Sequence, residues 1–414
     1  MKILLINNLH FKKGGAEKAY FDTAKILESH GHRVAFFSTK HSNNEKTEWE
    51  KYFVENVNYE NKNFSLWQKI KIAQKIIFNF EAKKNLEKLI ADFQPDIAHL
   101  HNTYHQLSPA IIYALKKYNI PIVMTLHDYK LISPNYSLFL NGNIWENRSL
   151  FSCIKDKCVK NSYSKSLVSV LEKIIHNFLG SYNKIDIFIS PSKFLIKKFK
   201  EFGFKRNAEF IPNPMENIKE NIKLENNSDN NTLVYYGRLS KEKGVDVAIR
   251  AMKFLDKSEK LKIIGEGPQK NNLIALVKEL DLESQVEFLG FKSGEDLQKI
   301  LIEAKAIIVP SIWYENMPYC VLESLALGKI VIASKIGGVP DLISNEENGF
   351  LFETGSAENL AQKIQNLKKY NLNEIKIKAK KSVVDFSIEN YYEKIIFIYK
   401  NLKSLTKFKK TDNV

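Results

Sequence analysis

The sequence predicts an α/β protein made of two similar domains. Short apolar runs typical of buried parallel strands alternate with helical stretches, and this alternation starts again near residue 232. A length of 414 residues is enough for two domains, each with its own core. Pro212 and Pro214 lie between the two alternations and resist a continuous helix. We therefore expect one domain over residues 1–213 and a second over 214–386.

The composition indicates a folded and strongly basic chain. Hydrophobic residues make up 44% of it, and the net charge is +15. Residues 1–215 carry 32 Lys and Arg but only 19 Asp and Glu, so most of the positive charge lies in the first half. This excess suggests an acidic partner: anionic lipid headgroups, a diphosphate-bearing acceptor or nucleic acid. A lysine-rich solvated face is the alternative.

Cysteine content and hydropathy exclude several classes of protein. The three cysteines, Cys153, Cys158 and Cys320, are an odd and sparse set, which argues against a disulfide framework. No second pair completes a zinc site beside Cys153 and Cys158. No apolar run approaches the ~18 residues that span a bilayer, and residues 1–8 are too short for a signal peptide. We expect a cytoplasmic protein without a metal centre.

A glycine pair follows the first expected strand. That strand covers residues 2–7 and leads through Gly14 and Gly15 into a helix. Glycine at such a turn lets backbone approach a ligand closely. A tight turn is the alternative, because the pair lacks the three-glycine dinucleotide pattern and no P-loop lysine follows.

The remaining first half alternates between strands and helices. Further strands are expected at residues 33–38, 95–101, 121–126 and 184–190. One long helix is predicted over residues 66–89, with an apolar side flanked by lysines that either packs into the domain or lies on a membrane. His127 follows the strand at 121–126, at the edge where chemistry is usually placed, although a satisfied polar residue is the alternative. Asp128 is expected to cap the local turn.

The second half begins with a basic loop between glycines. A strand at residues 232–236 leads into Gly237, and Arg238 and Lys243 follow before Gly244. Arginine can bind a phosphate with two hydrogen bonds and lysine adds a point charge, so the pair suits a diphosphate. An ordinary surface turn is the alternative.

Glycine also ends two later strands. The strands expected at residues 261–264 and 285–289 are followed by Gly265 and Gly290, and Phe291 comes next. Without a Cβ, the backbone at these carboxyl ends can approach a nucleobase.

Two glutamates occupy a strand–loop–helix–strand stretch around which the second half is organised. An apolar run at residues 306–309 precedes Glu315, and Glu323 lies in a helix expected between Pro318 and Gly328. Ligands of open α/β sheets bind at this edge, and carboxylates are good acceptors for sugar hydroxyls. The alternatives are that Glu315 caps the helix and that Glu323 is solvated.

These glutamates, with seven residues between them and followed by Gly328 and the run Gly337–Asp341, resemble the donor-site signature of the retaining family-4 glycosyltransferases. The resemblance covers nearly all of the chain. It implies the GT-B fold: two Rossmann-like doubly wound domains facing across a cleft. The C-terminal helix, here residues 387–404, would cross back to the first domain and leave a basic tail at 405–414.

The resemblance also implies an activity and a site. The activity is retaining transfer of a sugar from a nucleotide diphosphate donor, of the UDP or GDP type, to an acceptor hydroxyl. No Asp-x-Asp motif is present, so no metal or other cofactor is expected. The implied catalytic residues are His127, Arg238, Lys243 and Glu315. The implied donor contacts are Gly14, Gly15, Arg238, Lys243, Gly290, Phe291, Glu315 and Glu323.

The expected acceptor is a carbohydrate or a lipid-linked oligosaccharide of bacterial surface polysaccharide or glycolipid synthesis, used at the inner face of the cell membrane. Peripheral contact with anionic lipid would account for the basic first half. Nucleic acid is not expected, because no stacking or groove-reading motif accompanies the basic residues. Two other functions compatible with the same residues are a GT-B epimerase that hydrolyses a nucleotide sugar and a nucleotide-sugar-binding protein without turnover.

Overall fold

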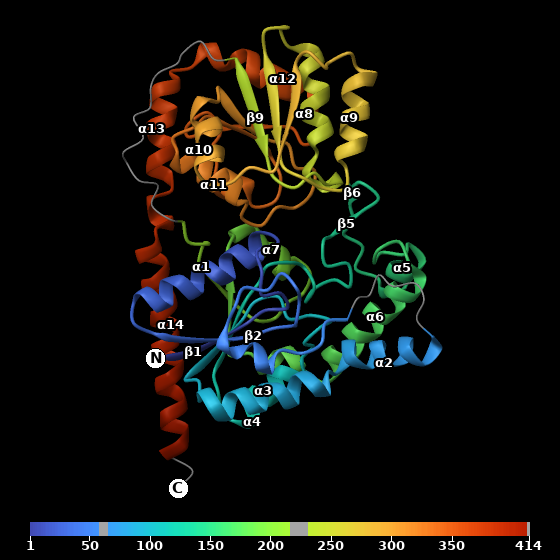
Figure 1. The fold of residues 1–414 in the computed structure, drawn as a ribbon, viewed down its shortest axis with the longest axis vertical. Helices are drawn as coiled ribbons and strands as arrows, with labels where there is room; N and C mark the ends of the chain where they lie inside the picture. Colours follow the sequence, from blue (N-terminus) through green and yellow to red (C-terminus); the bar gives the residue numbers. More distant parts are fainter. Residues whose placement is uncertain (58–64, 216–230, 412–414) are drawn as a thin grey trace. The chain divides into compact units, whose positions relative to one another are not determined.

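The computed structural model describes residues 1–57, 65–215 and 231–411, and the polar loop expected at 217–231 lies almost entirely outside them (Figure 1). The chain divides into two compact units. Unit 1 comprises residues 1–137, 147–214 and 388–414, and unit 2 comprises residues 138–146 and 215–387. The short segment 138–146, which the sequence alone assigns to the first domain, therefore groups with unit 2.

Unit 1 is built on a six-stranded parallel sheet with the strand order β2-β1-β3-β4-β7-β8. The strands are β1 (Lys2–Ile6), β2 (Arg33–Phe37), β3 (Ile97–Leu100), β4 (Ile122–Thr125), β7 (Ile187–Ser190) and β8 (Ala208–Phe210). The helices are α1 (Gly15–Ser29), α2 (Leu66–Ile77), α3 (Phe80–Phe93), α4 (Ala110–Lys117), α5 (Leu150–Lys155), α6 (Tyr163–Phe178), α7 (Lys193–Glu201) and α14 (Ile388–Thr411). Strands β3 and β4 are buried along their whole length, as expected for a sheet with both faces covered.

The single helix expected over residues 66–89 is wrong: the structure has two helices, α2 and α3. Asn79 separates them, since its side chain accepts a hydrogen bond from the Ala82 amide and caps α3. The same side chain donates to the Gln106 carbonyl at 2.6 Å and is buried. The break thus depends on a contact with a distant loop, which helical periodicity does not reveal.

Unit 2 is built on a second six-stranded parallel sheet, with the order β11-β10-β9-β12-β13-β14. Counted within the unit this is 3-2-1-4-5-6, the order of the Rossmann fold. The strands are β9 (Thr232–Tyr236), β10 (Lys260–Ile264), β11 (Val286–Gly290), β12 (Ala306–Val309), β13 (Val331–Ser334) and β14 (Phe350–Phe352). The helices are α8 (Val245–Ala251), α9 (Lys270–Glu279), α10 (Gly294–Glu303), α11 (Tyr319–Ala326), α12 (Ala357–Asn366) and α13 (Leu372–Ser382). Separate apolar clusters cover the two faces of the sheet.

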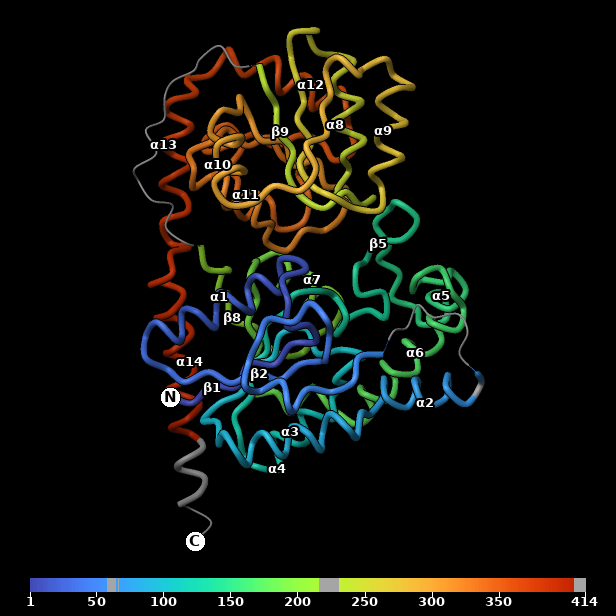
Figure 2. Tube along the Cα trace, in the orientation of Figure 1, coloured from blue at the N-terminus to red at the C-terminus, as the bar shows by residue number. Residues whose placement is uncertain are grey.

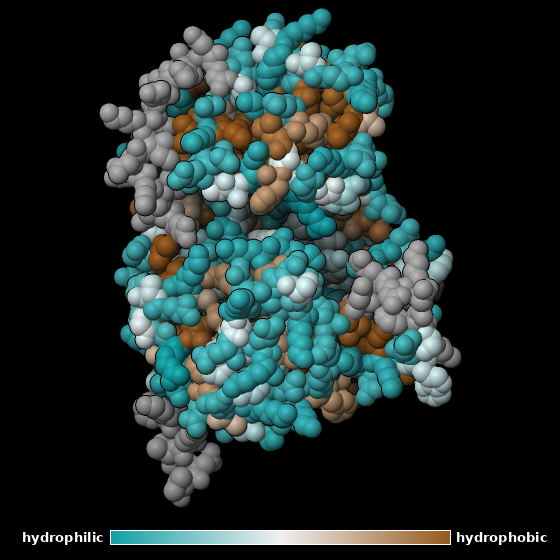
Figure 3. Space-filling view, in the orientation of Figure 1, coloured by the Kyte–Doolittle hydropathy of each residue, from teal (hydrophilic) through white to brown (hydrophobic). Residues whose placement is uncertain are grey.

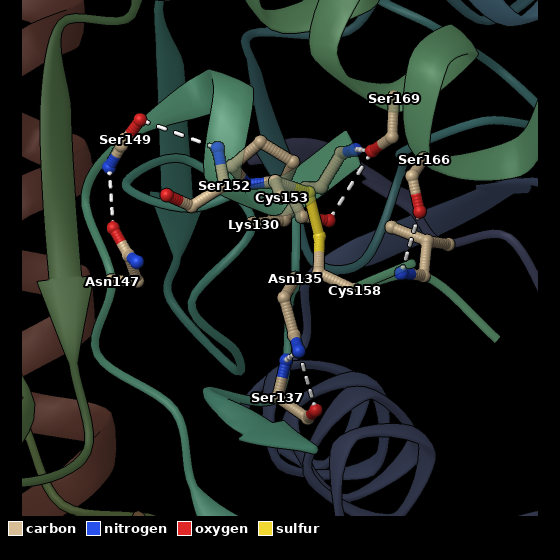
Figure 4. The surroundings of a disulfide bond; sticks show 12 residues. Lys130, Asn135, Ser137, Asn147, Ser149, Ser152, Cys153, Cys158, Ser166 and Ser169 are labelled. Carbon is tan, nitrogen blue, oxygen red and sulfur yellow. Dashed lines mark hydrogen bonds between the residues drawn. A yellow bond between two sulfur atoms is a disulfide. The ribbon is translucent and has the colours of Figure 1, made fainter. Parts of the chain in front are cut away.

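Residues 133–164 form a loop-rich insert. It contains the antiparallel hairpin β5 (Phe139–Leu140) and β6 (Asn143–Ile144), which is the part that groups with unit 2. In the part that belongs to unit 1, Cys153 and Cys158 form a disulfide beside Lys130 and Ser169 (Figure 4). The sparse cysteines argued against a disulfide framework, and the structure contains this single local bond.

The C-terminal helix α14 completes the core of unit 1 (Figure 2). Tyr391, Ile395 and Tyr399 are buried there, and the Tyr391 hydroxyl lies 2.7 Å from the Thr23 hydroxyl. The helix continues to Thr411, seven residues beyond the end expected at residue 404. Within the described ranges, no helix is long and apolar enough to cross a bilayer.

Candidate active site

Most of the residues expected to bind the donor nucleotide lie in unit 2, at or beyond the carboxyl ends of its strands, whereas Gly14 and Gly15 lie in unit 1. Strands β9 and β12 are neighbours in the sheet, so the loops that follow them emerge at one edge. The loop after β9 carries Arg238 and Lys243, and the loop after β12 carries Glu315. A backbone hydrogen bond from the Ile312 amide to the Glu242 carbonyl, 3.0 Å long, joins the two loops.

Glu315 and Lys243 form an ion pair. The Lys243 Nζ atom lies 2.6 Å from Glu315 Oε1, and the Ser311 hydroxyl donates to the same oxygen at 2.6 Å. Burial alone would raise the pKa of Glu315, but Lys243, Ser311 and Trp313 outweigh it and hold that pKa below its usual value. Burial would lower the pKa of Lys243, but Glu315 reverses this and raises it. Both groups are therefore charged at neutral pH.

Two glycines allow these loops to approach each other. Gly244 has φ +61° and Gly337 has φ +60°, which are left-handed conformations that favour glycine. A Cβ at Gly244 would collide with the Pro310 carbonyl, and one at Gly337 would collide with the backbone of Glu315. The Gly338 amide donates to the Glu315 carbonyl at 2.6 Å and fixes the backbone of the carboxylate. Both glycines were part of the predicted motifs, and the structure shows that a side chain at either position would collide with the neighbouring loop.

Arg238 is exposed, in contrast to its neighbour Lys243. Its carbonyl accepts a hydrogen bond of 2.8 Å from the Tyr235 hydroxyl, which anchors the loop while the guanidinium extends toward solvent. An exposed guanidinium on an anchored loop is suited to binding an anionic ligand.

Glu323 lies in α11, within the helix predicted there. Its Oε2 atom is 3.4 Å from the Tyr236 hydroxyl, at the end of β9. That hydroxyl also donates to the Cys320 carbonyl at 2.8 Å. The carboxylate is half-buried and thus partly accessible to a ligand.

Gly290 is the last residue of β11, two strands from β9, and Phe291 follows it. Gly290 has φ +67°, and its carbonyl accepts a hydrogen bond of 2.8 Å from the Gly265 amide. Phe291 is 73% exposed, so its ring is available to pack on a flat ligand. The structure does not bring Phe291 into contact with the ion pair.

His127 lies in unit 1, directly after β4, and contacts a histidine that the sequence analysis did not single out. His101 follows the adjacent strand β3, and its Nδ1 atom lies 2.9 Å from His127 Nε2. The rings stack at a centroid distance of 5.1 Å. Burial lowers the pKa of His127 to about 4 and that of His101 well below its usual value. Both imidazoles are therefore neutral at pH 7.

Asp128 caps its turn as expected. Its Oδ1 atom accepts a hydrogen bond of 2.9 Å from the Lys130 amide. Burial raises the pKa of Asp128 to about 6, despite the lowering effect of that hydrogen bond and of the Lys130 charge.

The glycine pair of unit 1 does not form a tight left-handed turn. Gly14 is extended at φ −164°, a conformation that any residue adopts, and Gly15 opens α1. A Cβ at Gly14 would make only an ordinary contact with Glu17, at 3.6 Å. Both glycines are exposed at the start of a 15-residue helix without a side-chain cap. Its amides are thus arranged as in anion-binding helix termini.

Sequence reasoning missed three residues that contact the expected site residues. They are Ser311 and Tyr236 in unit 2 and His101 in unit 1. Ser311 and Tyr236 stand at the carboxyl ends of β12 and β9, a position that could have marked them. His101 directly follows the last residue of β3, so its place at a strand's carboxyl end could also have marked it. Among the described residues, no group of three or more His, Cys, Asp or Glu side chains is arranged to hold a metal ion.

The family models match consecutive parts of this chain. The model described as Glycosyltransferase Family 4 matches residues 13–216, and the one described as Glycosyl transferases group 1 matches residues 216–409. A 42.6 kDa protein of unassigned function from the cps region of Klebsiella pneumoniae is 31% identical over 355 residues, covering 83% of this chain and 87% of that protein.

The chain belongs to the family-4 glycosyltransferases.

Two further relatives extend this comparison. The amylovoran biosynthesis glycosyltransferase AmsK of Erwinia amylovora is 33% identical over 132 residues, which are 30% of this chain and 32% of AmsK. The crystal structure of Anabaena HepE with UDP and glucose has a TM-score of 0.67 at 18% identity, over 97% of this chain and 100% of HepE. The fold of this glycosyltransferase is thus GT-B, with two Rossmann-like parallel-sheet domains.

Proposed function

We propose that this glycosyltransferase transfers a sugar from a UDP-sugar to an acceptor hydroxyl, with retention of the anomeric configuration and without a metal ion. The observation that carries the proposal is the Lys243–Glu315 ion pair at the carboxyl edge of the unit 2 sheet. It supplies a cation for the leaving diphosphate and a carboxylate for a sugar hydroxyl, 2.6 Å apart. HepE, which shares the fold, binds UDP and glucose, and this supports uridine as the base.

Arg238 and Lys243 act on the leaving group. Negative charge builds on the diphosphate as the bond between it and the anomeric carbon breaks, and nearby cations lower the energy of that state. Arg238 is exposed and able to bind two phosphate oxygens, while Lys243 contributes a point charge. Positive side chains in these places supply the stabilisation that a metal ion gives in other transferases.

Glu315 orients the sugar and does not attack it. Its Oε1 atom is already bound by Lys243 and Ser311, and its lowered pKa indicates a stabilised and weakly basic carboxylate. Both contacts draw electron density from the carboxylate, which makes it a poor nucleophile. Retention then follows a same-face route: the acceptor oxygen bonds to the anomeric carbon as the diphosphate leaves, and the acceptor proton passes to the leaving phosphate.

Glu323 and His127 bind hydroxyls. The half-buried carboxylate of Glu323 accepts hydrogen bonds from the ribose hydroxyls, and its Oε2 atom lies 3.4 Å from the Tyr236 hydroxyl. His127 is neutral, so it exchanges hydrogen bonds with the reacting sugar without adding a charge. Gly290 and Phe291 contact the base. In unit 1, the amides after Gly14 and Gly15 are available to an anionic group.

The acceptor belongs to bacterial surface polysaccharide or glycolipid synthesis. This part of the proposal is supported by AmsK, whose name assigns it to amylovoran biosynthesis, and by the cps-region relative. The enzyme then acts in the cytoplasm, at the inner face of the cell membrane, where lipid-linked acceptors are assembled.

Nucleotide-dependent thermal stabilisation tests the donor site. UDP, GDP, ADP, CMP and inorganic phosphate are added separately, with and without EDTA, and a ligand that binds the folded state raises the midpoint. We expect UDP to stabilise the wild type with EDTA present, and Arg238→Ala and Glu323→Ala to lose this effect. Arg250→Ala, an exposed arginine of α8, is the matched control and should keep it. No shift with any nucleotide in a folded protein would contradict the proposal.

Retention and transfer need a second assay. The product is followed by NMR of the anomeric proton, with a simple alcohol or sugar as acceptor. With a donor whose anomeric bond is axial, an axial glycoside in the product supports retention. An equatorial glycoside would overturn the proposal of retention. Release of free sugar without glycoside would instead indicate hydrolysis.

A further inference from the structure

Helix α6 has its polar face inward and its apolar face outward. Its inward residues include Ser166, Ser169, Glu172 and His176, all of which are buried. The outward residues form a stripe at helical spacing, with Phe178 89% exposed. The stripe consists of Tyr163, Leu167, Leu171, Ile174 and Phe178. A surface helix of a globular protein normally shows the reverse arrangement.

Buried polar contacts fix this orientation. Glu172 forms an ion pair of 2.7 Å with Lys130, and Lys130 also donates to Ser169 at 2.7 Å (Figure 4). His176 Nε2 lies 2.8 Å from the Ile77 carbonyl. Rotating the helix to bury the stripe would break these contacts and leave a buried charge without its partner, which is costly. The outward stripe is therefore a stable property of unit 1.

The neighbouring helix α2 adds apolar and basic side chains. The Ile77 carbonyl at its C-terminus makes the contact with His176, and Figures 1 and 2 show the two helices side by side. Trp67 is 76% exposed and Ile70 is 50% exposed, with Lys69 and Lys71 also exposed beside them. Apolar atoms appear on the surface in this part of unit 1 in Figure 3.

The charge on the three helices is mostly positive, and the exposed Asp156 directly follows α5. Helices α2 and α5 contain lysines but no Asp or Glu, and the only acid in α6 is the buried Glu172. Exposed or half-buried lysines of these helices are Lys69, Lys71, Lys75, Lys155, Lys165 and Lys173, and Lys75 forms an ion pair with Glu81. Phe151 of α5 is exposed as well. A protein partner would have to match this combination with its own acidic and apolar surface, whereas an anionic bilayer presents both over its whole area.

We propose that the surface formed by α2, α5 and α6 is a membrane-docking face, which binds an anionic lipid bilayer. The apolar stripe and Trp67 enter the headgroup–acyl boundary, and the lysines contact lipid phosphates. α6, with 16 residues, is about 24 Å long and lies in the plane of the interface. The docking face belongs to unit 1 alone. The docking proposal therefore does not depend on the donor chemistry proposed for unit 2.

Vesicle co-sedimentation of the full chain tests this surface. Vesicles of phosphatidylcholine containing about a third phosphatidylglycerol are compared with vesicles of pure phosphatidylcholine. We expect wild-type protein to sediment with the anionic vesicles and to be released as salt is raised. Leu171→Ser/Phe178→Ser should lower the partition coefficient at least about tenfold, since two exposed apolar side chains no longer enter the interface.

The control is Ile377→Ser/Phe397→Ser, which changes two exposed apolar residues outside the docking face and should bind as the wild type does. Lys69→Gln/Lys71→Gln, on the exposed side of α2, should weaken binding only to anionic vesicles. Wild-type protein that stays in the supernatant, or stripe variants that bind as the wild type does, would overturn the proposal. A wild-type dimer that the stripe variant abolishes, without vesicle binding, would instead assign the stripe to a second copy. Thermal stabilisation by UDP is measured on the same samples. A variant that loses vesicle binding but keeps this stabilisation has lost docking and not the donor site.

Discussion

The Nζ atom of Lys243 lies 2.6 Å from Oε1 of Glu315, so the cation expected at the diphosphate and the carboxylate expected at the sugar already neutralise each other. Their loops are joined by the hydrogen bond from Ile312 to Glu242. A donor that enters this site contributes its own negative charge next to Lys243. In the proposed donor site, the pair would therefore couple binding of the diphosphate to the position of the sugar.

This coupling is measurable by a double-mutant cycle. Lys243→Met and Glu315→Gln are expected to be non-additive in the free energy of unfolding, with an interaction energy of about 1 kcal/mol, since the pair is partly shielded from solvent. Glu315→Gln should also lower kcat about a hundredfold, because Lys243 loses its alignment and the sugar loses an acceptor. Urea unfolding and initial rates give the two quantities. Additive single effects on stability would show that the ion pair has no energetic role.

His101 is expected to act through His127 as a positioning residue. His101→Phe keeps an aromatic ring but removes the hydrogen bond to His127, and we expect a fall in kcat of about tenfold with little change in the donor KM. The pH–rate profile should change as well, because His127 loses its fixed hydrogen-bond partner. The exposed His41→Phe is the control. An unchanged profile with a lower melting temperature would indicate a structural role only.

Mild acid should destabilise unit 1. Burial lowers the pKa of His10 and His127 to about 4 and that of His99 to about 3, from 6.5. Between pH 6.5 and these values the unfolded chain binds more protons than the folded one, so the unfolding free energy falls as pH falls. Each such histidine contributes up to about 1.4 kcal/mol per pH unit. Urea titrations across this range check the slope, and a flat profile would contradict buried neutral histidines.

Loss of the Cys153–Cys158 bond should have a modest local effect. The bond joins residues five apart in sequence, so it closes a short loop, and chain-entropy arguments give about 2 kcal/mol. Alkylation of the oxidised, denatured protein without reductant should label Cys320 alone, as determined by mass spectrometry. Cys153→Ser/Cys158→Ser should raise hydrogen exchange in α5 while sparing unit 2. Labelling of all three cysteines would show that the bond does not form.

Periodicity predicted most strands well because buried parallel strands are short apolar runs with sharp ends. Strands β9 and β12 start and end at the residues expected from the sequence. The helix expected at 66–89 failed for a physical reason: Asn79 bonds to the distant Gln106 carbonyl, and no local pattern encodes that contact. Helix α14 also continues beyond its predicted end, to Thr411 instead of residue 404.

The sequence predicts which residues lie at the candidate site, but it does not predict the contacts between their side chains. Strand ends indicated Arg238, Lys243 and Glu315, because ligands of parallel sheets bind at that edge. That Lys243 contacts Glu315 could not be read from the sequence, since 71 residues separate them and only the folded loops bring the atoms to 2.6 Å. For the glycine pair, the local pattern suggested a tight turn that the structure does not have. Gly14 is extended and Gly15 is the first residue of α1.

The placement of α14 has a consequence for how the protein is made. Unit 1 begins with β1, yet its core includes Tyr391, Ile395 and Tyr399, which the ribosome adds after all of unit 2. At ~5–20 residues per second, the stretch between Pro214 and Ile388 takes roughly ten to thirty seconds to synthesise. During that time the nascent first unit exposes the apolar surface that α14 later covers. Chaperones that bind apolar segments would be needed most in this interval, and a premature stop within unit 2 would release a chain whose first unit has an uncovered core.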